Sequence, residues 1–181
     1  MTTGELLLNI GVLAFVLLNG LGIRPLTPRR FALPVALVVI VGFVFLPSAP
    51  IAGNDLDLDV VLGAAGVILG GLAGALMMVR RRASDGGAMT IAGLGYAALW
   101  IAVIGARILF GYGSSHWFAP EIDTFSRQHA ITGTSAWTAG FVVMAMAMVA
   151  TRVAVTGLKA AHIPGGAALL ATHPSRRRRF S

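Results

Sequence analysis

No cysteine occurs anywhere in the 181 residues of the chain. Its absence excludes disulfide bonds, thiolate metal sites, covalent attachment of c-type haem and lipidation through cysteine. Charged residues are also scarce, at 12% of the chain against about 25% in a typical soluble domain. Hydrophobic residues make up 56% instead, and this composition indicates an integral membrane protein.

Lysine and arginine outnumber the acids and give a net charge of +7. The arginines stand at the ends of apolar segments and form no stripe, so a nucleic-acid partner is not expected. Basic clusters beside a bilayer attract anionic lipid headgroups, and this is the role expected for Arg176–Arg179. Met1–Gly4 carries no basic residue and Glu5 is acidic, so we expect no cleaved signal peptide and read the apolar segment that follows as retained.

Apolar runs long enough to cross a bilayer occur five times. A hydrocarbon core of about 30 Å needs about 20 helical residues. The predicted spans are residues 5–22, 31–46, 60–79, 88–109 and 131–151. We therefore expect an all-α polytopic membrane helix bundle in which residues 1–152 form a single domain. Further on, Lys159, His162 and a Pro-Gly-Gly break keep apolar runs short, so residues 153–181 are expected to be a mobile basic cytoplasmic tail.

The charges lie on alternate sides of the predicted spans. One side holds twelve of the fourteen basic residues, namely Arg24, Arg29, Arg30, Arg80, Arg81, Arg82, Arg152, Lys159 and Arg176–Arg179. The other side holds six of the seven acids, namely Glu5, Asp55, Asp57, Asp59, Glu121 and Asp123. Because cytoplasmic loops carry the excess of Lys and Arg, we expect a multi-pass protein of the cytoplasmic (plasma) membrane with its N-terminus outside and its C-terminus in the cytoplasm.

Glycines recur every four residues in the third predicted span, at Gly66, Gly70 and Gly74. Residues four apart share one face of a helix, and the missing side chains let another backbone come close. The pattern predicts a helix-packing face. Whether its partner belongs to the same chain or to a second copy stays open at the level of sequence.

Arg107 is the one basic residue inside a predicted span. Charged residues within membrane helices are costly, and they mark functional sites or reach toward the headgroups. The outer half of the fifth span is unusually rich in hydroxyl groups. We expect Arg107, His129, Thr132 and Ser135 to line a small outward-facing polar pocket, although hydrogen bonding between helices explains the hydroxyl groups equally well.

His116 and His129 flank two carboxylates in the connection between residues 111 and 130 and are weak candidates for holding a cofactor. No ligand spacing supports such a site. The Gly53–Asp59 loop alternates aspartates as an EF-hand does, but Val60 stands where that motif requires glycine. We therefore expect no metal and no cofactor.

A motif of helix-boundary residues covers residues 22–47. It consists of Arg24-Pro25-Leu26-Thr27-Pro28-Arg29-Arg30, then Leu33-Pro34, then Gly42-Phe43 and Leu46-Pro47. This stretch resembles the corresponding part of the CcdC-like bacterial membrane proteins, and the glycine-bearing third span followed by positive charge is similar too. The resemblance implies a small multi-helix cytoplasmic-membrane protein without an established activity, in a family named for its association with cytochrome c maturation. The connection with His116 and His129 and the Arg-rich tail depart from that family.

Sequence signatures of catalysis are absent: the chain has no HExxH, no GxSxG and no paired carboxylates within a span. We therefore expect a non-catalytic scaffold or accessory component of a membrane assembly. Its partner is another membrane protein, or a second copy of the chain bound through the glycine face. The alternative is a small carrier, or a redox or metal accessory protein, that uses the polar pocket near Arg107 and His129.

Overall fold

The structure is a computed structural model that describes residues 22–25, 28–45, 52–81 and 88–162. Its elements are β1 (Gly22–Pro25), α2 (Pro28–Phe45), α3 (Asp55–Leu76), β2 (Met77–Arg81), β3 (Ala88–Ala92), α4 (Leu94–His116), α5 (Ala119–Gln128) and α6 (Thr134–His162). Three of the helices, α3, α4 and α6, are long and apolar enough to cross a membrane. A shorter apolar segment, Ala32–Val44, lies in α2.

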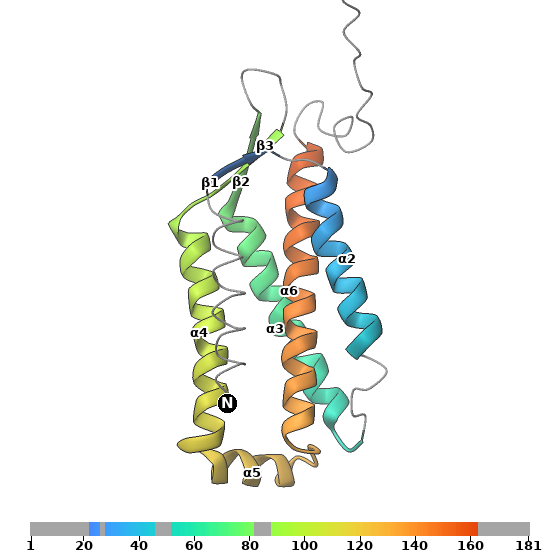
Figure 1. Ribbon diagram of the computed structural model, residues 1–181, viewed down its shortest axis with the longest axis vertical. Coiled ribbons are helices and arrows are strands. Elements are labelled where there is room, and N and C mark those ends of the chain that lie inside the picture. The colour runs from blue at the N-terminus through green and yellow to red at the C-terminus, as the bar shows by residue number, and fades with distance from the viewer. Residues whose placement is uncertain (1–21, 26–27, 46–51, 82–87, 163–181) are drawn as a thin grey trace, which may run out of the picture.

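The four long helices run side by side, and successive ones alternate in direction (Figure 1). The strands lie at one end of this bundle together with the last turns of α6, and we call this the sheet end. At the opposite end α5 lies across the bundle between α4 and α6, and we call this the α5 end (Figure 1). The described bundle therefore has two structurally different ends, one with strands and one with a short helix, and apolar helices connect them.

The central helix of the described bundle is α6, which packs against α3 along its length and against α2 on another side. The methionines of α6 divide between these neighbours. Met148 is buried beside Gly70 of α3, whereas the Cε atom of Met146 would lie 3.1 Å from a Cβ built at Gly42 of α2. Unbranched Met side chains thus fill gaps on both sides of α6.

The fourth helix approaches the bundle through larger side chains. Tyr96, Trp100 and Ile104, which recur at helical spacing on α4, are buried with Ala73 of α3 and Met148 of α6. Near the α5 end Phe110 of α4 continues this face, and its ring centroid lies 5.1 Å from that of Phe141 and 5.2 Å from that of Trp137 on α6. Aromatic packing therefore joins α4 to α6 where the two helices stand farther apart than α3 and α6.

A short amphipathic helix, α5, replaces the irregular connection expected between residues 111 and 130. Its polar face carries Asp123 and Arg127, which form an exposed ion pair at 3.5 Å. Its inner face buries Ser126, whose hydroxyl accepts a 3.2 Å hydrogen bond from the indole N–H of Trp137. A helix of this kind, apolar on one side and lying across the bundle end, suits a membrane surface.

A three-stranded antiparallel sheet occupies the sheet end, in the order β1-β3-β2. The expectation of an all-α chain is therefore wrong at this end, although the described part is mostly helical. The strand register places Thr90 between Arg24 and Val79, with Ile91 next to it between Ile23 and Met78. Beta-branched residues suit such pleated positions, and Pro25 ends an edge strand, where a missing N–H is tolerated.

The helix boundaries also differ from the predicted spans. The third helix begins at Asp55 rather than at residue 60 and ends at Leu76, because Met77 takes an extended conformation with φ −82° and ψ 125°. The fourth begins at Leu94, since residues 88–92 form β3, and continues to His116. Residues 153–162, expected in the mobile tail, are the last turns of α6. Residues 5–21 of the first predicted span and Arg176–Arg179 lie outside the described residues.

Candidate functional site

The four residues of the predicted outer pocket have separate surroundings. Thr132 donates hydrogen bonds to the carboxylate of Asp55 from both its backbone N–H and its hydroxyl. The Nδ1 atom of His129 lies 2.9 Å from the carbonyl oxygen of Phe125, and the two rings stack with centroids 4.1 Å apart. The guanidinium carbon of Arg107 lies 5.9 Å from the ring centroid of Phe141, and Ser135 is exposed.

Arg107 lies deeper in its helix than the predicted span implies. Because α4 continues to His116, Arg107 stands about 13 Å before the helix end at 1.5 Å per residue. Its side chain is half-buried against the ring of Phe141. A cation over an aromatic face is stabilised by the ring quadrupole, and more so where water is scarce, so Phe141 is the group that accommodates this charge.

The other candidate histidine, His116, is exposed at the end of α4. Its ring stacks on that of Tyr112 with centroids 4.2 Å apart, and its Nδ1 atom lies 3.0 Å from the carbonyl oxygen of Tyr112. Trp117, also exposed, meets the same Tyr112 ring edge-on. Among the described residues no three His, Asp or Glu side chains are grouped closely enough to hold a metal ion.

The start of α3 is fastened to the segment just before α6. Asp55, only 1% exposed, receives the two hydrogen bonds from Thr132. One residue earlier, the N–H of Asn54 donates to the carbonyl oxygen of Ala130 at 3.1 Å. Gly53 has φ +59°, and a Cβ there would lie 2.0 Å from the same oxygen. Only glycine fits this close approach, so the turn ties the two segments together.

The glycine face of α3 packs on α6 of the same chain. A Cβ built at Gly66 would lie 2.2 Å from the carbonyl oxygen of Met144, and one at Gly70 would lie 2.3 Å from that of Met148. At Gly74 the atom met is a side-chain carbon of Val155, 2.7 Å away. All three glycines are buried. The two backbones therefore approach to a distance that no side chain on this face of α3 permits.

At the sheet end the ammonium group of Lys159 binds the end of α3. It donates to the carbonyl oxygens of Gly74, Ala75 and Met77 at 2.9, 2.8 and 3.0 Å. The last carbonyls of a helix have no partner within the helix, and they form the negative end of its dipole. Lys159 satisfies three of them with one positive charge, using all three of its donors.

A second cation of α6, Arg152, reaches into the bundle toward α4. Its Nη1 atom donates a 2.8 Å hydrogen bond to the hydroxyl of Tyr96. Two nearby donors are buried and have no hydrogen-bond partner among the described residues, namely the Nε–H of Arg152 and the indole N–H of Trp100. Thr156, between Arg152 and Lys159 on the same helix, donates a 2.8 Å hydrogen bond to the carbonyl oxygen of Arg152, and its hydroxyl oxygen lies 3.8 Å from the sulfur of Met77.

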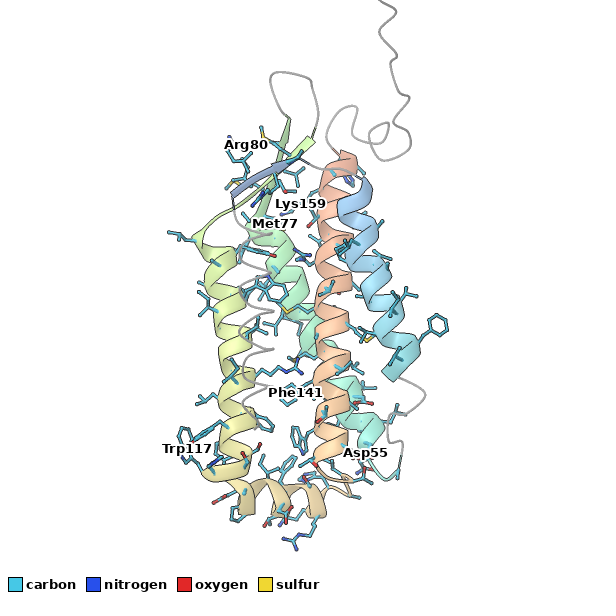
Figure 2. All side chains as sticks on the ribbon, viewed as in Figure 1. Asp55, Met77, Arg80, Trp117, Phe141 and Lys159 are labelled. Atoms are coloured by element: carbon cyan, nitrogen blue, oxygen red, sulfur yellow. The ribbon has the colours of Figure 1, made fainter. Side chains whose placement is uncertain are left out.

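An open hollow of about 690 Å³ lies at the sheet end, between β2 and the last turns of α6. Residues 77–80 of β2 line one side, and Val155, Leu158, Lys159 and His162 line the other. Figure 2 shows Arg80, Met77 and Lys159 gathered at this end, opposite Asp55 and Trp117. The hollow combines apolar walls with the cationic side chains of Arg80 and Lys159.

Sequence reasoning missed this basic site because it placed Lys159 in a tail. A signal was available in the spacing: Arg152, Thr156 and Lys159 stand at positions i, i+4 and i+7, which share one face of a helix. That pattern indicates that the last predicted span continues beyond Arg152. Which carbonyls Lys159 would bind, by contrast, depends on where α3 ends in space.

Comparisons of the chain with protein-family models, with curated proteins and with solved structures found no match.

Proposed function

We propose that this chain is a non-catalytic scaffold or accessory component of an assembly in the cytoplasmic membrane. The observation that carries the proposal is an exposed face of small residues on α4. Ala98, Ala102 and Ala106 recur there every four residues with Gly105 beside them, and all four are exposed. A Cβ built at Gly105 meets no described atom within 4 Å.

The same spacing already serves helix packing within this chain, at Gly66, Gly70 and Gly74. Small residues drive helix association in membranes because they allow extensive backbone contact. Tyr96 and Trp100 lie buried on the inner face of α4, whereas the small residues of its outer face are exposed and no contact with another described helix covers Gly105, so a helix of another membrane protein or of a second copy can pack there. An accessory role follows from a surface of this kind.

Topology is the second part of the proposal. We infer five crossings, made by α3, α4, α6, the shorter α2 and the first predicted span, of which Gly22 belongs to β1 instead. The excess of basic residues at the sheet end then places that end and the C-terminus in the cytoplasm and the α5 end outside. The resemblance of residues 22–47 to CcdC-like bacterial proteins is kept as part of this proposal, since those are small multi-helix proteins of the cytoplasmic membrane.

The test is to purify the full chain in mild detergent and to record its oligomeric mass, co-purifying proteins, metal content and absorption spectrum together. We expect a complex with a second copy or a defined partner, which Gly105→Leu weakens at least tenfold. Gly71→Leu is the matched control, because a Cβ at Gly71 also meets no described atom within 4 Å, yet this residue lies on α3.

Two results would contradict the scaffold. One is a monomer without partners whose behaviour Gly105→Leu leaves unchanged. The other is a Soret band or stoichiometric metal that disappears on substitution of His116 or His129, which supports a carrier or redox accessory working near Arg107 and His129 instead.

A further inference from the structure

The hollow at the sheet end has the composition of a site for an amphiphile. Two of its lining side chains, Met78 and Leu158, are 58% and 61% exposed although both are apolar. Arg80, Lys159 and His162 line the same hollow, and none of the described residues that line it is acidic. A ligand that fits such a surface has a hydrocarbon part and a negatively charged part.

The position of the hollow along the bundle points to lipid as the source of that ligand. It begins at Ala75, one residue before α3 ends, and continues along β2. The end of a membrane-spanning helix lies at the level of the lipid headgroups. With α3 crossing the membrane as proposed above, the exposed Met78 and Leu158 would lie beside acyl chains and the neighbouring cations at the depth of the phosphates.

The basic side chains that line the hollow differ in whether their N–H groups already form hydrogen bonds within the protein. Lys159 has committed all three N–H groups to the carbonyls of Gly74, Ala75 and Met77, so it contributes positive potential rather than a hydrogen bond. No hydrogen bond or ion pair of the Arg80 side chain to another described residue is found. The Nδ1 atom of His162 lies 2.8 Å from the carbonyl oxygen of Leu158, and no hydrogen bond of its Nε2 atom to another described residue is found.

We propose that this hollow binds one anionic phospholipid, with its phosphate on the guanidinium group of Arg80 and an acyl chain along Met78 and Leu158. Arginine suits the task because its planar guanidinium makes two parallel hydrogen bonds to phosphate oxygens. Basic pockets between membrane helices on the cytoplasmic side are general binding places for anionic headgroups. The site is separate from the small-residue face of α4 and does not depend on the scaffold role.

The test measures lipid retention by the full-length protein in detergent, using native mass spectrometry and thermal unfolding. Phosphatidylglycerol, phosphatidylcholine and glycerol phosphate are the three probes. We expect one retained phosphatidylglycerol per chain and a higher unfolding temperature, with at least tenfold weaker retention of phosphatidylcholine. Glycerol phosphate should neither bind nor compete at equal concentration, because it lacks the acyl chains.

Variants then locate the site. Arg80→Gln should reduce phosphatidylglycerol retention at least fivefold, whereas Arg127→Gln, which removes one exposed charge at the α5 end, should leave it unchanged. Leu158→Glu and Leu158→Gln differ only in charge at an exposed position, so the first should weaken retention further than the second. This second comparison keeps the test decisive if Arg80→Gln unfolds.

Equal retention of the two lipids, or equal effects of Arg80→Gln and Arg127→Gln, would overturn the proposal. Competition by glycerol phosphate at concentrations matching phosphatidylglycerol would also overturn it, by showing a site for a soluble phosphate. Equal retention by Leu158→Glu and Leu158→Gln would show that no anion lies beside this wall.

Discussion

Lys159 binds the backbone at the point where it leaves α3. A helix that ends inside a protein must satisfy its last carbonyl groups, and here a side chain from another helix does so. The ammonium group bonds to Gly74, Ala75 and Met77, and the chain turns into β2 at that point. The charge is favourable there, because cations are stabilised at the negative end of a helix dipole.

We expect Lys159→Met to lower the free energy of unfolding by about 1.5–3 kcal/mol, the range for lost hydrogen bonds to a charged group. The apolar methionine keeps most of the stem but leaves three carbonyls without their donor. Unfolding in detergent with added denaturant, followed by circular dichroism, measures the change.

Arg127→Met is the control for that experiment. Arg127 is also cationic, but both side chains of its ion pair with Asp123 are exposed. Exposed ion pairs contribute about 0–1 kcal/mol to the free energy of unfolding. Equal losses in the two variants would show that Lys159 acts only as a surface charge.

The helices α3 and α6 form a unit held together by contacts at three places along their length. Asp55 binds Thr132 at the α5 end, the glycine face closes the middle, and Lys159 holds the sheet end. The two charged contacts have opposite signs, each suited to the end of α3 at which it lies, since the helix N-terminus favours an anion and the C-terminus a cation. The remaining helices pack around this unit.

Gly70→Ala tests the contact between the glycine face of α3 and α6, in the middle of the two helices. A Cβ there would lie 2.3 Å from the carbonyl oxygen of Met148, so α3 and α6 must separate and lose contact along the glycine face. Overpacking of this kind costs about 1–3 kcal/mol, and we expect a loss of unfolding free energy in that range.

The neighbouring glycine supplies the matched control. At Gly71 a Cβ meets no described atom within 4 Å, and Ala is the better helix former by about 1 kcal/mol in soluble helices. Gly71→Ala should therefore be neutral or stabilising. A similar loss in both variants would mean that helix propensity, and not the distance between α3 and α6, explains the effect.

At the scale of the whole molecule, charge separates the two ends of the described bundle. The sheet end carries Arg24, Arg80, Arg152 and Lys159, and the α5 end carries Asp55, Asp57, Asp59, Glu121 and Asp123. The apolar helices between them span the distance that a bilayer requires. This asymmetry is the basis of the proposed orientation.

The natural absence of cysteine makes that orientation directly measurable. We expect a cysteine introduced at Asp123, on the exposed face of α5, to react with a membrane-impermeant maleimide in intact cells. A cysteine at His162 should react only after the membrane is opened. The reverse pattern, or a C-terminal reporter active outside the cytoplasm, would contradict the orientation, and labelling of the unmodified chain measures the background.

Periodic features could be read from the sequence, and spatial partners could not. The spacing of Gly66, Gly70 and Gly74 predicted a packing face, because helix geometry is local, but the choice of α6 as its partner follows from the path of the whole chain. Thr132 was predicted to line a polar pocket with Arg107, His129 and Ser135, yet its carboxylate partner, Asp55, is 77 residues away. The prediction of an outer pocket assumed that Arg107, His129, Thr132 and Ser135 lie close together. The tertiary structure gives Thr132, His129 and Arg107 different neighbours, and sequence spacing alone does not show this.

Composition and residue order are enough to show that the chain is rich in apolar segments of membrane length and that its basic and acidic residues fall at alternate boundaries of these segments. Composition and period suffice for this, since a bilayer selects for length and apolarity whatever the fold. The tertiary structure alone decided that the chain leaves α3 as a strand at Met77, that Lys159 ends that helix, and that a basic hollow forms beside it. Each of these depends on groups far apart in the chain, which the packing of α3 on α6 brings together.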